Sequence, residues 1–249
     1  MRLSQEPTEN TATPRRDRLR ERIVDAAERV IAEKGLPGLK AREVAGAAGC
    51  ALGAIYTVFA DLDEVILQVG LRTLARLEKE LSAPGEGDAL DHAALEPKRS
   101  NADNVIHSKS SERDPSEKPV STFSHRALER LALAYLAFAR RETPSWRALF
   151  DYRLPPGVPL PDWFAIERDR LFALLEAPLS ALLPDRPADE VRRRARTLFS
   201  AVHGVVALGL EEKLGDSRGA ALETELKEFV ATFSRGLAAG DKAREGKRT

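Results

Sequence analysis

Cysteine, long apolar runs and net charge are what this sequence has least of. One cysteine, Cys50, stands among 249 residues, which excludes an intrachain disulfide framework and a cysteine-rich zinc site and fits a reducing compartment. No run of apolar residues approaches the roughly 20 that span a membrane, so we expect no membrane partner. Residues 1–22 are polar and lack the apolar segment of a secretory signal peptide. These absences predict a cytoplasmic protein.

The residue patterns of catalytic and metal centres are also missing. No two of the four histidines show the spacing of metal ligands: His92, His107, His125 and His203. The sequence contains no glycine-rich phosphate-binding loop and no nucleophile–base arrangement. We therefore expect no metal, no cofactor and no enzymatic activity. A helical enzyme and a purely interacting helical module stay open as alternatives.

The formal net charge is zero because 39 basic residues balance 39 acidic ones. These charges are unevenly placed along the chain. Residues 15–60 carry nine basic and six acidic side chains, including a run of arginines between Arg15 and Arg22. Residues 84–122 carry five basic and eight acidic side chains and few large apolar ones, which is typical of a disordered linker or of a docking or phosphorylation segment. The zero sum therefore does not argue against a nucleic-acid partner.

Apolar residues recur at three- and four-residue steps through most of the chain, and no segment alternates as a strand does, so we predict an all-α fold. Two short helices are expected at 40–48 and 52–59. They are joined at Gly49, because glycine tolerates the positive φ of a tight turn. Asp61 and Glu64 form a capping-box pattern that predicts the start of another helix. Two short helices joined by a glycine turn indicate a helix-turn-helix, whose second helix lies in the DNA major groove.

The span from Arg22 to Leu81 resembles the N-terminal domain of TetR-type (TetR/AcrR) transcriptional regulators. The motifs that carry the resemblance are Ile23-Val-Asp-Ala-Ala, Glu33-Lys-Gly35, Arg42-Glu-Val-Ala-Gly-Ala-Ala-Gly49 and Gly53-Ala-Ile-Tyr-x-x-Phe59. Ala201-Val-His-Gly204 is similar to the C-terminal domain of one subgroup of this family. The resemblance implies a three-helix DNA-binding domain followed by a helical ligand-binding and dimerisation domain. It also implies a ligand-responsive regulator, most often a repressor, that binds a palindromic double-stranded operator as a homodimer.

The resemblance assigns roles to matching positions of the helix-turn-helix. Lys40, Arg42 and Tyr56 would contact phosphates, and the dipole of the helix at 40–48 would help Lys40 and Arg42 at its start. The groove would be faced by the remaining candidate residues, Ala51, Leu52, Gly53, Ala54 and Thr57. The arginines from Arg15 to Arg22 could follow the backbone or enter the minor groove, or could simply be a solvated helix start.

This sequence also departs from the family pattern. Leu62 stands where a phosphate-binding lysine is usual, and Ala51 stands where a serine commonly caps the recognition helix. The side chains of Leu52, Gly53 and Ala54 offer no hydrogen bonds to base edges. We therefore expect fewer phosphate contacts, with apolar contact to thymine methyl groups and DNA shape contributing more to recognition.

The C-terminal part offers candidates for an unknown small-molecule effector and for the dimer. Aromatic residues and one histidine could wall an effector pocket, although helical spacing makes core packing the alternative: Trp146, Phe150, Tyr152, Phe164 and His203. Two apolar stripes predict a four-helix bundle across a two-fold axis: Leu198, Val202 and Val205 in one helix, and Leu226, Phe229, Val230 and Phe233 in the next.

These patterns divide the chain as follows. We predict a disordered arm at 1–14, the helix-turn-helix domain at 15–60 and a connecting helix at 61–83. The disordered insertion or linker follows at 84–122. The helical effector-binding and dimerisation domain covers 123–240, and a disordered tail covers 241–249.

Overall fold

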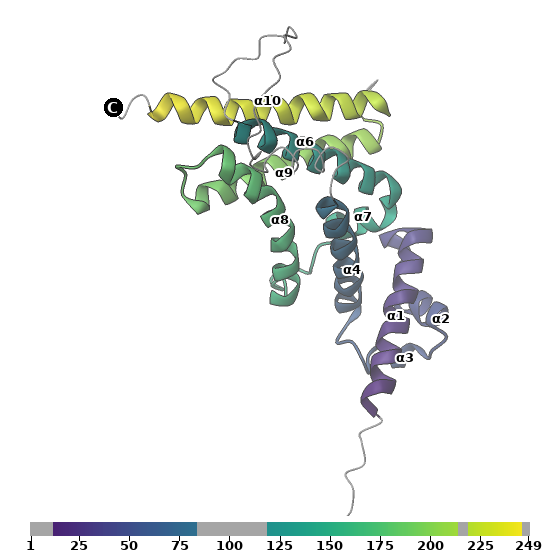
Figure 1. Cartoon of the computed structure of the whole chain (residues 1–249). Helices are drawn as coiled ribbons and strands as arrows, with labels where there is room; N and C mark the ends of the chain where they lie inside the picture. The colour runs from purple at the N-terminus through teal and green to yellow at the C-terminus, as the bar shows by residue number, and fades with distance from the viewer. Residues whose placement is uncertain (1–11, 84–118, 214–218, 246–249) are drawn as a thin grey trace, which may run out of the picture. The chain divides into compact units, whose positions relative to one another are not determined.

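The computed structural model describes residues 12–83, 119–213 and 219–245. Every regular element in these ranges is helical, which confirms the predicted all-α class (Figure 1). The helices are α1 (Ala12–Lys34), the short 3₁₀ helix η1 (Leu36–Gly38), α2 (Ala41–Ala48), α3 (Leu52–Ile55), α4 (Leu62–Ser82), α6 (Pro119–Arg141), α7 (Thr143–Asp151), α8 (Asp162–Leu182), α9 (Ala188–Leu210) and α10 (Ala220–Glu245).

The predicted disordered segments lie largely outside the described residues. Where they overlap, the structure is helical: residues 12–14 belong to α1, 119–122 to α6, and 241–245 to α10. Each of these helices therefore extends beyond the boundary that the sequence pattern suggested. Among the described helices, none is long and apolar enough to cross a lipid bilayer.

The chain forms two compact units. The first, here called the N-terminal unit, comprises Met1–Leu77 and Phe138–Arg168, and the second, the C-terminal unit, comprises Glu78–Ala137 and Asp169–Thr249. The helix-turn-helix therefore shares its unit with most of α4, with α7 and with the first residues of α8. The predicted boundary near residue 60 does not mark this division, because periodicity within one helix cannot show which helices pack together.

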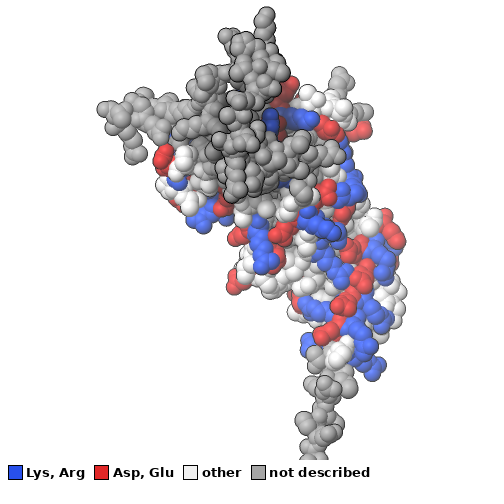
Figure 2. Space-filling model, in the orientation of Figure 1, with Lys and Arg blue, Asp and Glu red and all other residues white. Residues whose placement is uncertain are grey.

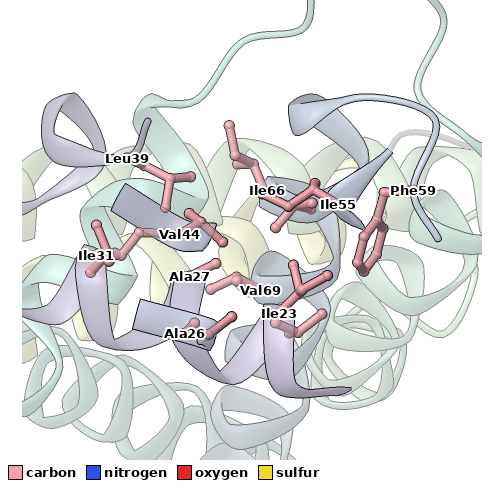
Figure 3. Close-up of a cluster of buried hydrophobic side chains, with 14 of the residues drawn as sticks. Ile23, Ala26, Ala27, Ile31, Leu39, Val44, Ile55, Phe59, Ile66 and Val69 are labelled. Atoms are coloured by element: carbon pink, nitrogen blue, oxygen red, sulfur yellow. The ribbon is translucent and has the colours of Figure 1, made fainter. Parts of the chain in front are cut away.

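The core of the N-terminal unit is built where α1, α2, α3 and α4 meet (Figure 3). Ile23, Ala27 and Ile31 follow one another at four-residue steps on α1, so they share one face of that helix. All three are fully buried. Val44 of α2 and Ile55 of α3 are also fully buried in this cluster. Each large side chain buried in this way contributes about 1.5–3 kcal/mol to folding, and together they fix α2 and α3 on α1.

A charge network links α1, α4 and the start of α7 within the same unit. Arg72 of α4 pairs with Asp25 and Glu28 of α1, and Arg76 pairs with Glu28. The Nε of Arg76 also donates to a carboxylate oxygen of Glu142, 2.8 Å away. These partly exposed pairs share partners, and a network of this kind orients the helices more firmly than isolated surface pairs do.

The C-terminal unit is held by close contact between α9 and α10. A Cβ added at Gly209 of α9 would lie 2.5 Å from Cδ2 of Leu222 on α10, so any larger residue would force the Leu222 side chain to shift. On α10, Leu222, Leu226 and Val230 recur at four-residue steps and are fully buried or nearly so. A hydrogen bond of 2.7 Å between Nδ1 of His125 and the Ser234 hydroxyl joins α6 to α10.

Candidate nucleic-acid interface

The turn between α2 and α3 has the geometry that the sequence predicted. Gly49 adopts φ 63° and ψ 43° in the left-handed region, and its N–H donates to the last turn of α2. Arg22 and Arg29 of α1 donate to the carbonyl oxygens of Ala48 and Ala47 respectively. Cations at a helix C-terminus stabilise its exposed carbonyl groups. These contacts hold the C-terminal end of α2 on α1, and α3 follows directly after it (Figure 1).

Helix α3 and the turn that follows it (residues 52–59, here called the α3 segment) present one face to the core and another to solvent. Ile55 and Phe59 are 0% and 2% exposed, whereas Leu52 and Tyr56 are 45% and 53% exposed. The other predicted groove residues divide similarly: Ala51, Gly53 and Thr57 are exposed and Ala54 is half-buried. The candidate groove-facing residues thus lie on an accessible surface, and their contact with DNA stays a prediction.

The two predicted phosphate-binding cations lie at the start of α2. Lys40 is the N-cap residue, in an extended conformation, and Arg42 is in the first turn; both side chains are exposed. The acidic residue of this turn, Glu43, is ion-paired with Lys34. The hydrogen bond from Lys34 lowers the pKa of Glu43, so the carboxylate stays ionised. The positive charge of Lys34 offsets the negative charge of this carboxylate. The first turn of α2 can therefore accept an anion without strong repulsion from Glu43.

The arginine cluster between Arg15 and Arg22 separates into two groups. Arg20 turns inward: it donates to the Val58 carbonyl and to the Glu64 carboxylate, each at 2.6 Å, and lies 4.2 Å from the centre of the Phe59 ring. Arg22 binds the end of α2, as described above. Arg15, Arg16 and Arg18 are exposed. Arg20 and Arg22, of which Arg22 is also exposed, hold the helix-turn-helix on α1, so Arg15, Arg16 and Arg18 are the candidates for DNA contact.

The start of α4 confirms the predicted capping pattern. The N–H of Glu64 donates to Asp61 Oδ1 at 2.8 Å, and the Glu64 carboxylate accepts from the N–H of Ala60 at 2.8 Å. Burial raises the pKa of Glu64, but the hydrogen bonds from Ala60 and Arg20 outweigh it, so the pKa lies below its ordinary value of 4.5. Leu62, which replaces the usual lysine, packs against the core.

The surface charge is mixed. On the face shown in Figure 2, basic and acidic side chains are interspersed over the described residues. On this face, the described residues therefore form no single broad basic surface. Any DNA affinity must depend on where the basic side chains lie, since their net attraction at long range is small.

The predicted effector residues do not form a single group. In the N-terminal unit, the Trp146 and Phe150 rings lie 5.7 Å apart, and Tyr152 and Phe164 line a cavity of about 10 Å³, roughly the space of one water molecule. Trp146 and Phe164 are buried, which favours the core-packing alternative for both. Burial raises the pKa of Tyr152, and the Asp63 carboxylate adds to the rise.

His203, the remaining candidate, lies in the C-terminal unit. Its Nδ1 makes a 2.8 Å hydrogen bond with the Tyr135 hydroxyl, and its ring stacks on Phe199 at 5.9 Å. Phe172 contacts Phe199 edge-on at 5.4 Å. The sequence pattern did not indicate that Tyr135 and Phe172 belong to this group around His203. Only the four-residue step from Phe199 to His203 on α9 could have signalled part of it.

The predicted dimer residues also divide by burial. The fully or almost fully buried members are Leu198, Val202, Leu226 and Val230. The half-buried members are Val205, Phe229 and Phe233. The first group forms the core of a single chain, so it is not available to a partner in this conformation. Leu208, with 43% of its surface exposed, lies on α9 three residues after Val205.

These geometries define an all-helical protein with an N-terminal helix-turn-helix. Two family models match the chain: "Bacterial regulatory proteins, tetR family" over residues 23–69, and "Tetracyclin repressor-like, C-terminal domain" over residues 128–233. The first covers the helix-turn-helix and the second covers most of α6 to α10. The chain belongs to the TetR family of transcriptional regulators.

Solved structures show the same fold. A protein of unknown function from Rhodococcus sp. RHA1 is 20% identical, with 94% of this chain and 100% of that chain covered and a TM-score of 0.59. A tetR-family transcriptional regulator from Streptomyces coelicolor is 17% identical, with 92% and 86% covered and a TM-score of 0.58. A TetR transcriptional regulator from Rhodococcus sp. RHA1 is 15% identical, with 87% and 96% covered and a TM-score of 0.52. A search of curated protein sequences finds no match.

Proposed function

We propose that this protein is a ligand-responsive transcriptional repressor that binds a palindromic operator as a homodimer. The observation that carries the proposal is the outward face of the helix-turn-helix. There, Leu52 and Tyr56 of the α3 segment are exposed, and the cations Lys40 and Arg42 lie at the start of α2. Membership of the TetR family supports the same proposal of DNA binding.

Tyr56 is the residue that we expect to fix the position of α3 on the DNA backbone. Its ring lies on the exposed face, four residues after Leu52, and its hydroxyl can donate to a phosphate oxygen. Lys40 and Arg42 would add electrostatic contacts at the N-terminus of α2. Ala51, Gly53, Ala54 and Thr57 would face the groove between these backbone contacts, as listed for the interface above.

Dimerisation follows from the small size of the recognition surface. A single α3 of four residues reads too few base pairs for useful specificity, whereas a dimer reads two half-sites about 34–36 Å apart, or a multiple of that distance. Among the residues predicted for the dimer, half-buried Val205, Phe229 and Phe233 have surface available to a partner chain, and exposed Leu208 adds to them. We propose that these side chains form the isologous contact.

The effector would act by favouring a conformation that does not fit the operator. Such an effector must bind that conformation more tightly than the DNA-binding one, since equal affinity shifts no equilibrium. In the C-terminal unit, His203 with its aromatic neighbours Tyr135 and Phe199 offers both stacking and hydrogen-bonding groups. In the N-terminal unit, Phe150 and Tyr152 are the partly exposed members of the predicted effector set.

Selection of fragments from genomic DNA tests the proposal. The purified chain should enrich fragments that contain an inverted repeat, and an effector screen against the enriched fragment should find a compound that releases it. Tyr56→Phe should weaken binding at least about tenfold for each half-site, because a hydrogen bond to a charged group contributes about 1.5–3 kcal/mol. Lys227→Gln, which changes an exposed side chain on α10, is the control and should bind DNA with wild-type affinity. Failure to enrich any fragment at low salt would contradict the proposal.

A reporter gene placed behind the selected fragment tests the sign of regulation. Repression predicts low expression in the presence of the protein and recovery with Tyr56→Phe. Expression that rises with the wild-type protein would identify an activator instead.

A further inference from the structure

We propose that Leu52 selects a thymine in each half-site by contact with its 5-methyl group. This inference rests on the proposed DNA-binding function and adds to it the chemistry that the recognition helix reads. The group recognised is the methyl carbon that thymine presents in the major groove.

The position of Leu52 is the first ground for this inference. It is a large apolar side chain with 45% of its surface exposed, although Ile55 and Phe59 nearby are almost completely buried. Residues four apart share a face of a helix, so Leu52 points to the same side as Tyr56, which is 53% exposed. An exposed leucine on this face gains the free energy of hydrophobic burial only when a partner covers it.

The small neighbours of Leu52 are the second ground. Ala51 and Gly53 flank it and are exposed. A Cβ added at Gly53 would meet no atom within 4 Å, and the glycine does not have positive φ. The fold therefore does not require glycine here. The first turn of α3 carries Leu52 as its one long exposed side chain, with a small exposed residue before it and open space at Gly53 after it.

Chemical complementarity is the third ground. The side chains of residues 51–54 contain no hydrogen-bonding group, and the hydroxyl of Thr57 donates to the Ala54 carbonyl at 2.7 Å. In the major groove, thymine alone among the four standard bases presents a methyl group, whereas the other bases present only donors and acceptors at their edges. A leucine would bury those polar edges without a partner, which is unfavourable. Leu52 would therefore favour thymine and also disfavour its competitors.

Uracil substitution isolates the methyl group. In the operator found by fragment selection, each thymine is replaced in turn by uracil, which removes the methyl and leaves the base pair intact. The proposal predicts one symmetry-related pair of positions at which uracil weakens binding of the wild-type protein. The expected loss is about fourfold for one half-site and about fifteenfold for both, from the transfer energy of one buried methyl group.

The Leu52→Ala variant removes the protein side of the same proposed contact. This variant should unfold at the wild-type temperature because Leu52 is exposed, and it should bind thymine and uracil operators equally at the position concerned. Val158→Ala, which shortens another exposed apolar residue, should keep the wild-type preference. Wild-type binding that is insensitive to uracil everywhere, or Leu52→Ala that keeps the preference, would overturn the proposal and leave DNA binding intact. Absence of any selected operator would instead overturn the proposed function on which it rests.

Discussion

The α2–α3 pair and the α9–α10 pair both carry apolar stripes, yet the two pairs use them differently. In α2 and α3, the stripe Val44, Ala45 and Ile55 is buried on α1, and one large apolar residue, Leu52, is left outside. In α9 and α10, buried and half-buried apolar residues follow one another on the same helices, as Val230 and Phe233 do.

This difference teaches what an apolar pattern can and cannot specify. A short helix with one exposed leucine between small residues has a distinct inside and outside, so each side chain can be assigned from its spacing. Two long helices with wide apolar surfaces contain both a core and a possible interface. Their periodicity is the same in either case, so only the packing of one chain separates the two.

Leu226 offers the largest expected effect in this comparison. Because it is fully buried, Leu226→Ala should lower the free energy of unfolding by about 2–5 kcal/mol, at any protein concentration. Phe229→Ala, its half-buried neighbour, should instead weaken dimerisation, measured by sedimentation at micromolar concentration. If Leu226→Ala left thermal stability unchanged and affected only the dimer, the assignment of this residue to the core would be wrong.

Arg20 tests whether the arginine cluster positions the helix-turn-helix. Arg20→Met removes hydrogen bonds to Val58 and Glu64 and should lower the free energy of unfolding by about 2 kcal/mol, after allowance for its partial exposure. The exposed neighbour Arg18 provides the control, since Arg18→Met should change stability by less than about 0.5 kcal/mol. Equal stability of the two variants, measured by chemical denaturation, would argue against this positioning role.

The contribution of Glu64 to the free energy of unfolding depends on pH. Its folded-state pKa lies below 4.5, so its stabilising effect is present above pH 4.5 and is lost as the pH falls through the lower folded value. Glu64→Gln should cost about 1 kcal/mol at neutral pH and should reduce the loss of stability on acidification. Wild-type and variant curves that stay parallel below pH 4.5 would contradict the assignment.

Gly53 gives the smallest expected effect on stability. Gly53→Ala should raise the free energy of unfolding by up to about 1 kcal/mol, because alanine favours helix and the added Cβ has open space. DNA affinity should fall if α3 approaches the bases closely. Gly46→Ala in α2, where the space is also open, controls for helix propensity and should keep more of the affinity. Gly53→Ala with full affinity would show that α3 keeps its distance from the bases.

The local features of the helix-turn-helix could be predicted because they depend on neighbouring residues. Gly49 ends α2 with positive φ, and Asp61 caps α4, as their positions suggested. The inward turn of Arg20 could not be predicted, since its partners Val58 and Glu64 lie 38 and 44 residues away. An arginine in a basic run looks the same whether it contacts a carboxylate or faces water.

The C-terminal half was less predictable for a related reason. The aromatic residues expected to line one effector pocket fall in one compact unit, whereas His203 falls in the other. The sequence contains their types and spacing but not which helices pack together. Leu62 shows the same limit at a single residue: its place in the family pattern suggested a lost phosphate contact, and the structure adds that it packs on the core.

The salt dependence of DNA affinity tests the central claim most directly. Affinity for the selected fragment is measured from low to high salt with the wild-type chain, with the double variant Lys40→Gln and Arg42→Gln, and with Lys227→Gln. The account predicts a steep fall of wild-type affinity with salt, a slope lower by about one for each phosphate contact removed in the double variant, and no change in the control. Affinity that does not respond to salt, or a double variant with the wild-type slope, would contradict it.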